Sequence, residues 1–306
     1  MKTLKYFFGS AIVLMALSAC SNKEDEMVKA PEVKAITITT DDDETRTTMT
    51  AQSDGSYTFK WSAGDKLRII HEGVGSDGKY VDHHYYVSNA LGAAASKASF
   101  TFYAEGFSDP KIVKHRFYAV SPASCLNCFW EADKHLNPVV EIPIDQTPSA
   151  NSFDPNADIL VSEMKASTVL PDNLSMKFAR VGCIVRIKVT GLPANGKLTS
   201  ATWSNGPSWA PTYLVEYDPV KKCVGDYEKP VNEIRVHGPL NIDSDGSVVL
   251  WLRTKSGTLT DWFQLDVTAK DASNVTKYYT KHVDSASIKF TEGKIAKFAV
   301  AVLEEE

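Results

Sequence analysis

The feature that most constrains the fold of this chain is a series of short stretches in which apolar and polar side chains alternate. In one of them, Tyr57, Phe59 and Trp61 fall on one side of an extended chain, and Thr58 and Lys60 fall on the other. A period of two residues is typical of a β-strand, and no long stretch shows the 3.6-residue period of an amphipathic helix. Short strands at this density, separated by turn residues, predict an all-β fold built from sandwiches.

The predicted strands run along most of the chain after its first 30 residues. Their ranges are Val33 to Thr40, Thr45 to Thr50, Tyr57 to Trp61, Leu67 to Ile70, Tyr80 to Ser88, Ala98 to Tyr103, Arg116 to Val120, Val139 to Ile144, Leu174 to Val189, Val248 to Arg253, Trp262 to Thr268, Lys277 to Thr280 and Ile295 to Val302. The turn residues Ala63-Gly64-Asp65 predict a hairpin in which Tyr57 to Trp61 pairs with Leu67 to Ile70.

The length of the chain, once its leader is removed, suffices for two domains that each bury a core. We place the boundary near Pro171 to Leu174, in a polar gap, which predicts an N-terminal β-sandwich over 32–172 and a C-terminal one over 173–306. The formal net charge of -5 leaves no basic footprint. Nucleic acid is therefore not an expected partner.

The first 20 residues have the layout of an export signal. Lys2 and Lys5 give a basic start, Tyr6 to Leu17 form an apolar run, and Ser18-Ala19-Cys20 end it with small residues and a thiol. The run is too short to span a bilayer, so residues 1–19 are predicted to be a signal peptide. The order resembles a bacterial lipoprotein box, which implies that Cys20 is acylated, with palmitate, and becomes the first mature residue. The alternative is an ordinary signal peptide with an incidental cysteine.

Residues 20–31 are predicted to form a flexible tether behind that lipid. Ser21 to Glu26 are polar and mostly charged, and they resemble the short leader that directs lipoproteins of the Bacteroides group to the outside of the outer membrane. Several acyl chains hold a protein on a membrane where a single chain does so only marginally. The expected location is the cell outer membrane, facing outward, and a periplasmic location is the alternative.

The four other cysteines are Cys125, Cys128, Cys183 and Cys223. Their irregular spacing does not make a disulfide scaffold, and their redox state stays open. Cys125 and Cys128 have the spacing of a redox pair without its βαβ context, and a zinc site would need a second close pair. We expect no metal and no cofactor. Because the carboxylates and histidines form no spaced constellation for catalysis, we do not expect an enzyme.

An ordered series of motifs covers nearly the whole chain: Thr45-Arg46-Thr47, Phe59 to Asp65, Phe117 to Pro122, Ile142 to Thr147, Phe153 to Pro155, Ala157 to Val161, Met176 to Val181 and Phe290 to Lys294. The series resembles that of the fimbrillin-like surface lipoproteins of the Bacteroides group, whose members include subunits of type V pili. No single motif is specific, whereas the order of the series is. The resemblance implies two tandem transthyretin-like Greek-key β-sandwich domains after a lipoprotein signal peptide.

The same resemblance implies assembly by donor-strand exchange with other pilus subunits. In polymerising members an arginine-specific protease cuts after the first strand, which here places the cut between Arg46 and Thr47 and makes Val33 to Thr40 the expelled strand. Ile295 to Val302 is the candidate donor for the next subunit. Since Glu304 to Glu306 end the chain directly after that strand, we expect no spare strand to lend. Shaft, tip, anchor and stand-alone adhesin stay open as roles.

Trp203 and Trp209 lie in a stretch rich in Gly and Pro. If their rings are exposed, they would stack on sugars, which is the basis of an alternative function: a surface glycan-binding lipoprotein. The other interpretation is that both rings pack over the C-terminal sandwich. Host molecules and glycans therefore stay open as ligands.

Overall fold

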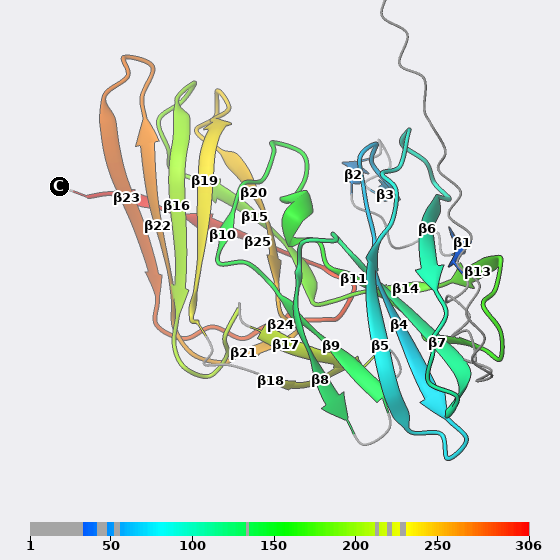
Figure 1. Ribbon diagram of the computed structural model, residues 1–306. Helices are drawn as coiled ribbons and strands as arrows, with labels where there is room; N and C mark the ends of the chain where they lie inside the picture. Colours follow the sequence, from blue (N-terminus) through cyan, green and yellow to red (C-terminus); the bar gives the residue numbers. More distant parts are fainter. Residues whose placement is uncertain are drawn as a thin grey trace, which may run out of the picture. The chain divides into compact units, whose positions relative to one another are not determined.

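The computed structural model describes residues 33–41, 48–51, 56–132, 135–211, 214–218, 222–226 and 231–305. They belong to one compact unit, Pro31–Glu306. Nearly all regular structure in these ranges is β (Figure 1), which confirms the all-β prediction. One turn of 3₁₀ helix, η1 (Pro155–Ala157), interrupts the strands. No helix in the described ranges is long and apolar enough to cross a bilayer.

Two sheets enclose the apolar residues of the N-terminal half. In the first, the strand order is β13 (Asn173–Met176), β1 (Val33–Thr40) and β6 (Ser99–Glu105). In the second, it is β14 (Phe178–Arg180), β11 (Leu160–Ser162), β7 (Ile112–Ser121), β4 (Arg68–Gly75) and β5 (Tyr80–Val87), and β12 (Lys165–Ser167) also pairs with β7. All pairs of the second sheet are antiparallel.

Two further sheets enclose the apolar residues of the C-terminal half. The larger has the order β10 (Asp145–Gln146), β19 (Glu233–Asn241), β16 (Lys197–Asn205), β22 (Phe263–Lys270), β23 (Thr276–Val283) and β26 (Leu303–Glu304). The smaller has the order β20 (Val248–Thr254), β15 (Cys183–Thr190) and β25 (Ile295–Ala301). In it β15 pairs parallel with β25 and antiparallel with β20.

Three small sheets complete the described structure. They are the pair β2 (Thr48–Ala51) and β3 (Tyr57–Lys60), the pair β21 (Gly257–Leu259) and β24 (Ile288–Phe290), and the series β18 (Lys222–Asp226), β17 (Leu214–Asp218), β9 (His135–Glu141) and β8 (Leu126–Ala132).

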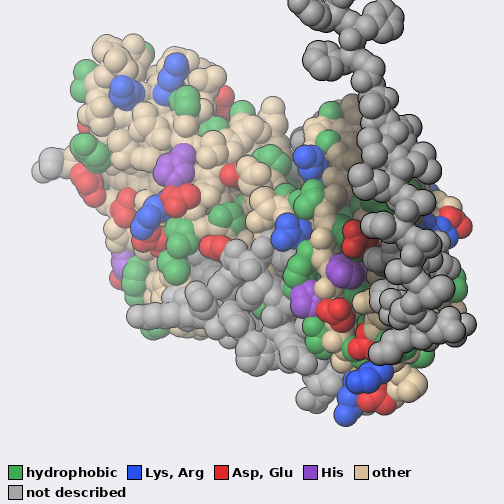
Figure 2. All heavy atoms as spheres, viewed as in Figure 1, with side chains coloured by type: hydrophobic (Ala, Val, Ile, Leu, Met, Phe, Trp, Pro, Cys, Tyr) green, Lys and Arg blue, Asp and Glu red, His purple; other side chains and the backbone are tan. Residues whose placement is uncertain are grey.

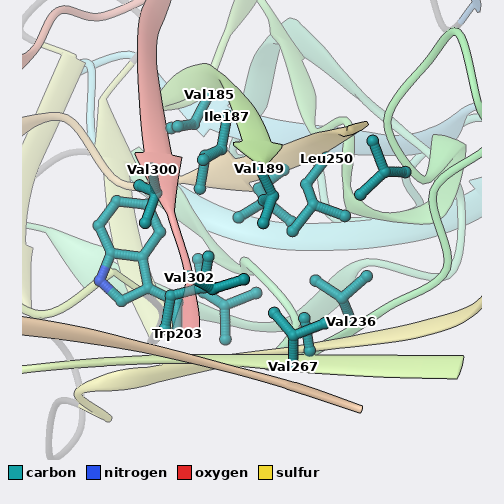
Figure 3. Packing of buried hydrophobic residues seen from close by; sticks show 14 of the residues in the cluster. Val185, Ile187, Val189, Trp203, Val236, Leu250, Val267, Val300 and Val302 are labelled. Carbon is teal, nitrogen blue, oxygen red and sulfur yellow. The ribbon is translucent and has the colours of Figure 1, made fainter. Parts of the chain in front are cut away.

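Each pair of large sheets shares an apolar core. In the C-terminal half, Val185, Ile187 and Val189 of β15 face the side chains of the six-stranded sheet (Figure 3). This every-second-residue burial is the one that the sequence pattern predicts. In the N-terminal half, Leu174 and Met176 join the core formed with strands that precede them, although they follow the predicted domain boundary.

The predicted hairpin between Tyr57 to Trp61 and Leu67 to Ile70 is wrong. β3 pairs with β2, whereas β4 pairs with β5 and β7. Trp61 forms a bridge with Ala95 and is fully buried in the N-terminal core. The residues of β4 after Arg68 are buried on both faces, which suits a strand with neighbours on both sides.

The predicted strand Leu174 to Val189 is divided among β13, β14 and β15. Gly182 stands just before β15 with φ +77°, a left-handed conformation that favours glycine. A Cβ atom at this position would collide with the backbone oxygen of Thr254. The chain therefore turns at Gly182, and the strands on either side of it enter different sheets.

Candidate functional site

β1, the strand that the resemblance marks as exchangeable, lies in the middle of its sheet. It pairs antiparallel with β6 over seven residue pairs, from Val33 to Thr39. On its other side Thr37 to Thr40 pair in parallel with β13. Because β1 has a hydrogen-bonded ladder on each side, removing it would create two new sheet edges, and unpaired edges are templates for another strand.

The inward face of β1 fills a groove in the N-terminal core. Ile36 and Ile38 are both 0% exposed, whereas Val33 on the outer face is 60% exposed. The two isoleucines belong to the same core as Phe100 and Met176 from the flanking strands. Burial of an Ile side chain contributes about 1.5–3 kcal/mol. The groove therefore selects a strand with bulky apolar side chains two residues apart.

Polar contacts fix both ends of β1. At one end, the Thr40 amide donates to the Ala98 carbonyl at 3.0 Å, and the Ala98 amide donates to Thr40 Oγ1 at 3.0 Å. At the other end, Lys34 Nζ donates to the Leu170 carbonyl at 2.9 Å and lies 3.0 Å from Asp172 Oδ1. The register of β1 in the groove is therefore set by specific partners as well as by the ladder.

Replacement of Thr40 with Val is expected to lower the free energy of unfolding by about 1–3 kcal/mol, because Val keeps the volume but offers the buried Ala98 amide no acceptor. Thr37→Val is the matched control. Its hydroxyl shares a part-buried hydrogen bond of 3.2 Å with Thr101, so its loss is expected to cost less than about 1 kcal/mol. Urea denaturation measures both variants, and equal losses would contradict this account of how β1 is held.

The predicted cleavage point falls in the connection after β1. β1 ends at Thr40 and β2 begins at Thr48, so Arg46 and Thr47 stand between two strands in the sequence. Both residues lie outside the described residues, as do Cys20, the predicted signal peptide and the predicted tether. The described structure therefore bears on the flanking strands alone.

β25, the candidate donor strand, is part of its own core. It pairs in parallel with β15 over seven residue pairs, from Ile295 to Ala301. Val300 is 6% exposed, and Phe298 packs against the C-terminal core. Lending β25 to another subunit would remove these contacts from its own sandwich.

Trp203 and Trp209 are buried, with exposed fractions of 1% and 6%. Figure 3 shows the Trp203 indole among the side chains of the C-terminal core. The Trp209 ring stacks on Phe290, with 4.3 Å between the ring centroids. Trp203 stands at an inward position of β16, which is why it cannot reach a ligand. Of the two interpretations of these rings, the structure therefore confirms packing into the C-terminal core and rules out stacking on sugars.

Cys125 and Cys183 are free thiols. Burial raises the pKa of Cys125 to about 12 and also raises the pKa of Cys183 above its usual value. Since the thiolate is the reactive form, neither of these thiols is reactive at neutral pH. The side chains of Cys128 and Cys223 are outside the described set.

A buried charge cluster, which the sequence does not reveal, joins strands of different sheets. Arg180 of β14 donates to Asp158 through Nε at 2.7 Å and Nη2 at 3.2 Å. Arg253 of β20 places its Nε 3.1 Å from the same carboxylate and donates from Nη2 to the Val181 carbonyl at 2.6 Å. The side chains of Asp158 and Arg253 are 0% exposed and that of Arg180 is 2% exposed. Two guanidinium groups therefore share one carboxylate away from water.

A second group that sequence reasoning misses is a pair of histidines in the N-terminal half. His71 of β4 is 0% exposed, and its Nε2 lies 2.8 Å from Nδ1 of His115 on β7. Its ring stacks on Phe117 at 4.5 Å and lies 4.5 Å from Phe107. Burial, and then the nearby His115 and His84, lower the pKa of His71 to about 3. Among the described side chains, no group of three or more His, Cys, Asp and Glu is arranged to hold a metal ion.

No protein-family model matches this chain, and no curated protein matches it. Among solved structures, it is similar to a candidate cell adhesion protein from Bacteroides fragilis NCTC 9343, with 12% identity, a TM-score of 0.50 and coverage of 90% of this chain and 96% of that one. A candidate cell adhesion protein from Bacteroides ovatus ATCC 8483 has 13% identity, a TM-score of 0.49 and coverage of 90% and 97%. The fimbrial anchor protein Mfa2 from Porphyromonas gingivalis has 11% identity, a TM-score of 0.35 and coverage of 89% and 90%. At such identities, the likeness to the Bacteroides fragilis protein is one of fold.

Proposed function

We propose that this protein is a lipid-anchored cell-surface protein of the fimbrial class, either a pilus subunit or an accessory adhesin, and not an enzyme. Acylated Cys20 would hold the uncut chain in the outer membrane, facing outward, and other pilus subunits would be its partners. Assembly would proceed by donor-strand exchange. Shaft, tip and anchor positions are all compatible with this proposal.

The observation that carries the proposal is the setting of β1. The strand fills an apolar groove with Ile36 and Ile38 and has a ladder on each side. Once the connection that contains Arg46 is cut, non-covalent contacts alone would hold β1 in place. A strand from another subunit that offers the same apolar pair would then compete for the same groove. The fold shared with a candidate adhesion protein of Bacteroides fragilis supports the same class.

Replacement of Arg46 with Lys is the direct test of cleavage. The variant keeps the positive charge but removes the side chain that an arginine-specific protease requires. In outer membranes and shed fibres, wild-type protein is expected to begin at Thr47, whereas Arg46→Lys is expected to begin at lipid-modified Cys20 and to form no SDS-resistant ladder. Mass spectrometry of the N-terminal peptide and gel electrophoresis without boiling make the two measurements.

Arg235→Lys is the matched control, because Arg235 is an arginine of β19 whose side chain is 54% exposed. It is expected to be processed and assembled like the wild type. If Arg46→Lys is cut like the wild type, cleavage after Arg46 by an arginine-specific protease is refuted. A wild-type chain that keeps Cys20 at its start in shed fibres would refute strand exchange by cleavage and leave an anchored adhesin.

A further inference from the structure

The outer side of the six-stranded sheet of the C-terminal half (β10, β19, β16, β22, β23 and β26) carries an ordered array of polar side chains. β22 and β23 place Gln264 opposite His282 and Asp266 opposite Thr280, at positions that alternate with core residues. β16 extends the same two rows with Ser204 and Thr202. We call these six residues the polar array. Over β16, β22 and β23, Figure 2 shows tan surface, which is backbone and uncharged polar side chains, with acidic, basic and hydrophobic side chains in patches among it.

Hydrogen bonds between its members hold the polar array in one arrangement. Gln264 Nε2 donates to both carboxylate oxygens of Asp266, at 2.8 and 3.0 Å. Thr280 Oγ1 donates to Asp266 Oδ1 at 2.7 Å, and His282 Nδ1 lies 3.3 Å from Gln264 Oε1. A carboxylate offers about four acceptor sites, so Asp266 can still accept from a ligand. Because these side chains are already ordered, a ligand would not have to immobilise them on binding.

An aromatic pair stands at one end of the polar array. The half-buried ring of Trp262 stacks on His282, with 5.5 Å between the centroids and 28° between the planes. The His282 side chain is 45% exposed. A Trp ring gives a flat apolar face with a polar edge, and this is the surface on which the C–H face of a sugar ring packs.

The composition of this face favours an uncharged ligand. The polar array holds one carboxylate and no lysine or arginine. Its two rows continue on β19 as Glu233 and Arg235, which pair with each other, and Asp284 lies 3.3 Å from His282 Nε2. A polyanion such as a nucleic acid or an acidic glycan would meet no net positive charge. A stable protein partner would bury an apolar patch, which these two rows of polar side chains do not offer.

We propose that the polar array and Trp262 form a binding site for neutral polysaccharide, with a sugar ring on the face of the Trp262 indole opposite His282 and its hydroxyl groups bonded to Asp266 and Gln264. The inference rests on the proposed function, since an adhesin needs a ligand, and it names the class of that ligand. It also moves the glycan hypothesis from the buried Trp203 and Trp209 to a face that solvent reaches.

Affinity electrophoresis of the full chain, solubilised in detergent, tests the site. The gels would contain a glucan, a mannan or a galactan as neutral probes and a polygalacturonate as the acidic probe. At least one neutral polysaccharide is expected to retard the wild type. Trp262→Ala and the isosteric Asp266→Asn are expected to weaken that binding about tenfold or more. Tyr103→Ala is the control, because Tyr103 of β6 is an aromatic residue with 61% exposure away from this sheet.

Thermal unfolding checks that each variant is folded. If Trp262→Ala is unstable, the binding measured with Asp266→Asn tests the site instead. The proposed site is overturned if no neutral polysaccharide retards the wild type, whether or not the acidic probe does. It is also overturned if Tyr103→Ala weakens the binding as much as Trp262→Ala and Asp266→Asn do. Trp262→Ala is expected to keep N-terminal processing and the SDS-resistant ladder. If the wild type assembles but binds no neutral polysaccharide, this inference alone is refuted. If it binds a neutral polysaccharide but does not assemble, only the fibre-forming role is refuted.

Discussion

Replacement of Asp158 with Asn is expected to lower the free energy of unfolding by about 3–5 kcal/mol, because it leaves two buried guanidinium groups without their shared counter-charge. Burial lowers the pKa of Arg253 to about 10, and the attraction of Asp158 opposes that shift. Arg253 therefore stays charged at neutral pH in the folded protein. Asn is close to Asp in volume, so the loss reports on charge rather than on a cavity. Denaturation in urea at pH 7 measures it.

Asp172→Asn is the matched control for this prediction. Asp172 also lies within 3.0 Å of a cation, Lys34, but its side chain is 78% exposed. Exposed ion pairs contribute between about 0 and 1 kcal/mol, so this variant is expected to change little. Similar losses in the two variants would mean that water reaches Asp158, against the burial that the structure shows.

Acidification is expected to destabilise the protein well above the pH at which most carboxylates titrate. The pKa of His71 is lowered from 6.5 to about 3, so the unfolded chain takes up a proton before the folded chain does. The contribution of His71 is fully present above pH 6.5 and is lost as the pH falls from 6.5 toward 3. Each pH unit costs about 1.4 kcal/mol per group, or about 2–3 kcal/mol from pH 6.5 to 4.5. Urea denaturation at several pH values in this range measures the slope.

His71→Phe isolates the part of that slope that belongs to His71. The titratable groups around the ring are His84, His115 and Tyr86, and the described residues place no carboxylate in contact with it. Phe preserves the packing between Phe107 and Phe117. Unfolding of the variant in this pH range is therefore expected to take up about one proton fewer than unfolding of the wild type. His115→Gln is the comparator. Burial also lowers the pKa of His115, but that ring is half-buried and its loss should flatten the slope less. An unchanged slope in His71→Phe would refute this origin of acid lability.

The alternation of side chains predicts where many of the strands lie but not which strands pair. In β15 the period of two residues identifies Cys183, Val185, Ile187 and Val189 as a core face, and the structure confirms it. The same pattern in β3 predicts the wrong partner, since a turn signal before Leu67 says nothing about the competing pair β2–β3. Pairing depends on long-range packing, which a local pattern does not contain.

Burial on a second face is also invisible in the sequence. Arg253 follows Trp251 on the side of β20 opposite Leu250 and Leu252, where an alternating pattern predicts solvent, yet Trp251 is 4% exposed and Arg253 is 0% exposed. Asp158 pairs with Arg180, which lies 22 residues away, and His71 pairs with His115, which lies 44 residues away, so neither pairing has a local signal. The sequence leaves the burial of Trp203 open for a related reason: no strand is predicted over Lys197 to Asn205, so its inward position on β16 has no local signal.

The two ladders of β1 impose a direction on whatever replaces it. β1 runs antiparallel to β6 and parallel to β13, and a substitute restores both patterns only if it enters with the same N-to-C orientation. A polymer that grew by such substitutions would have two unlike ends, with every subunit pointing the same way along it. Growth and capping would then be events at opposite ends of the filament.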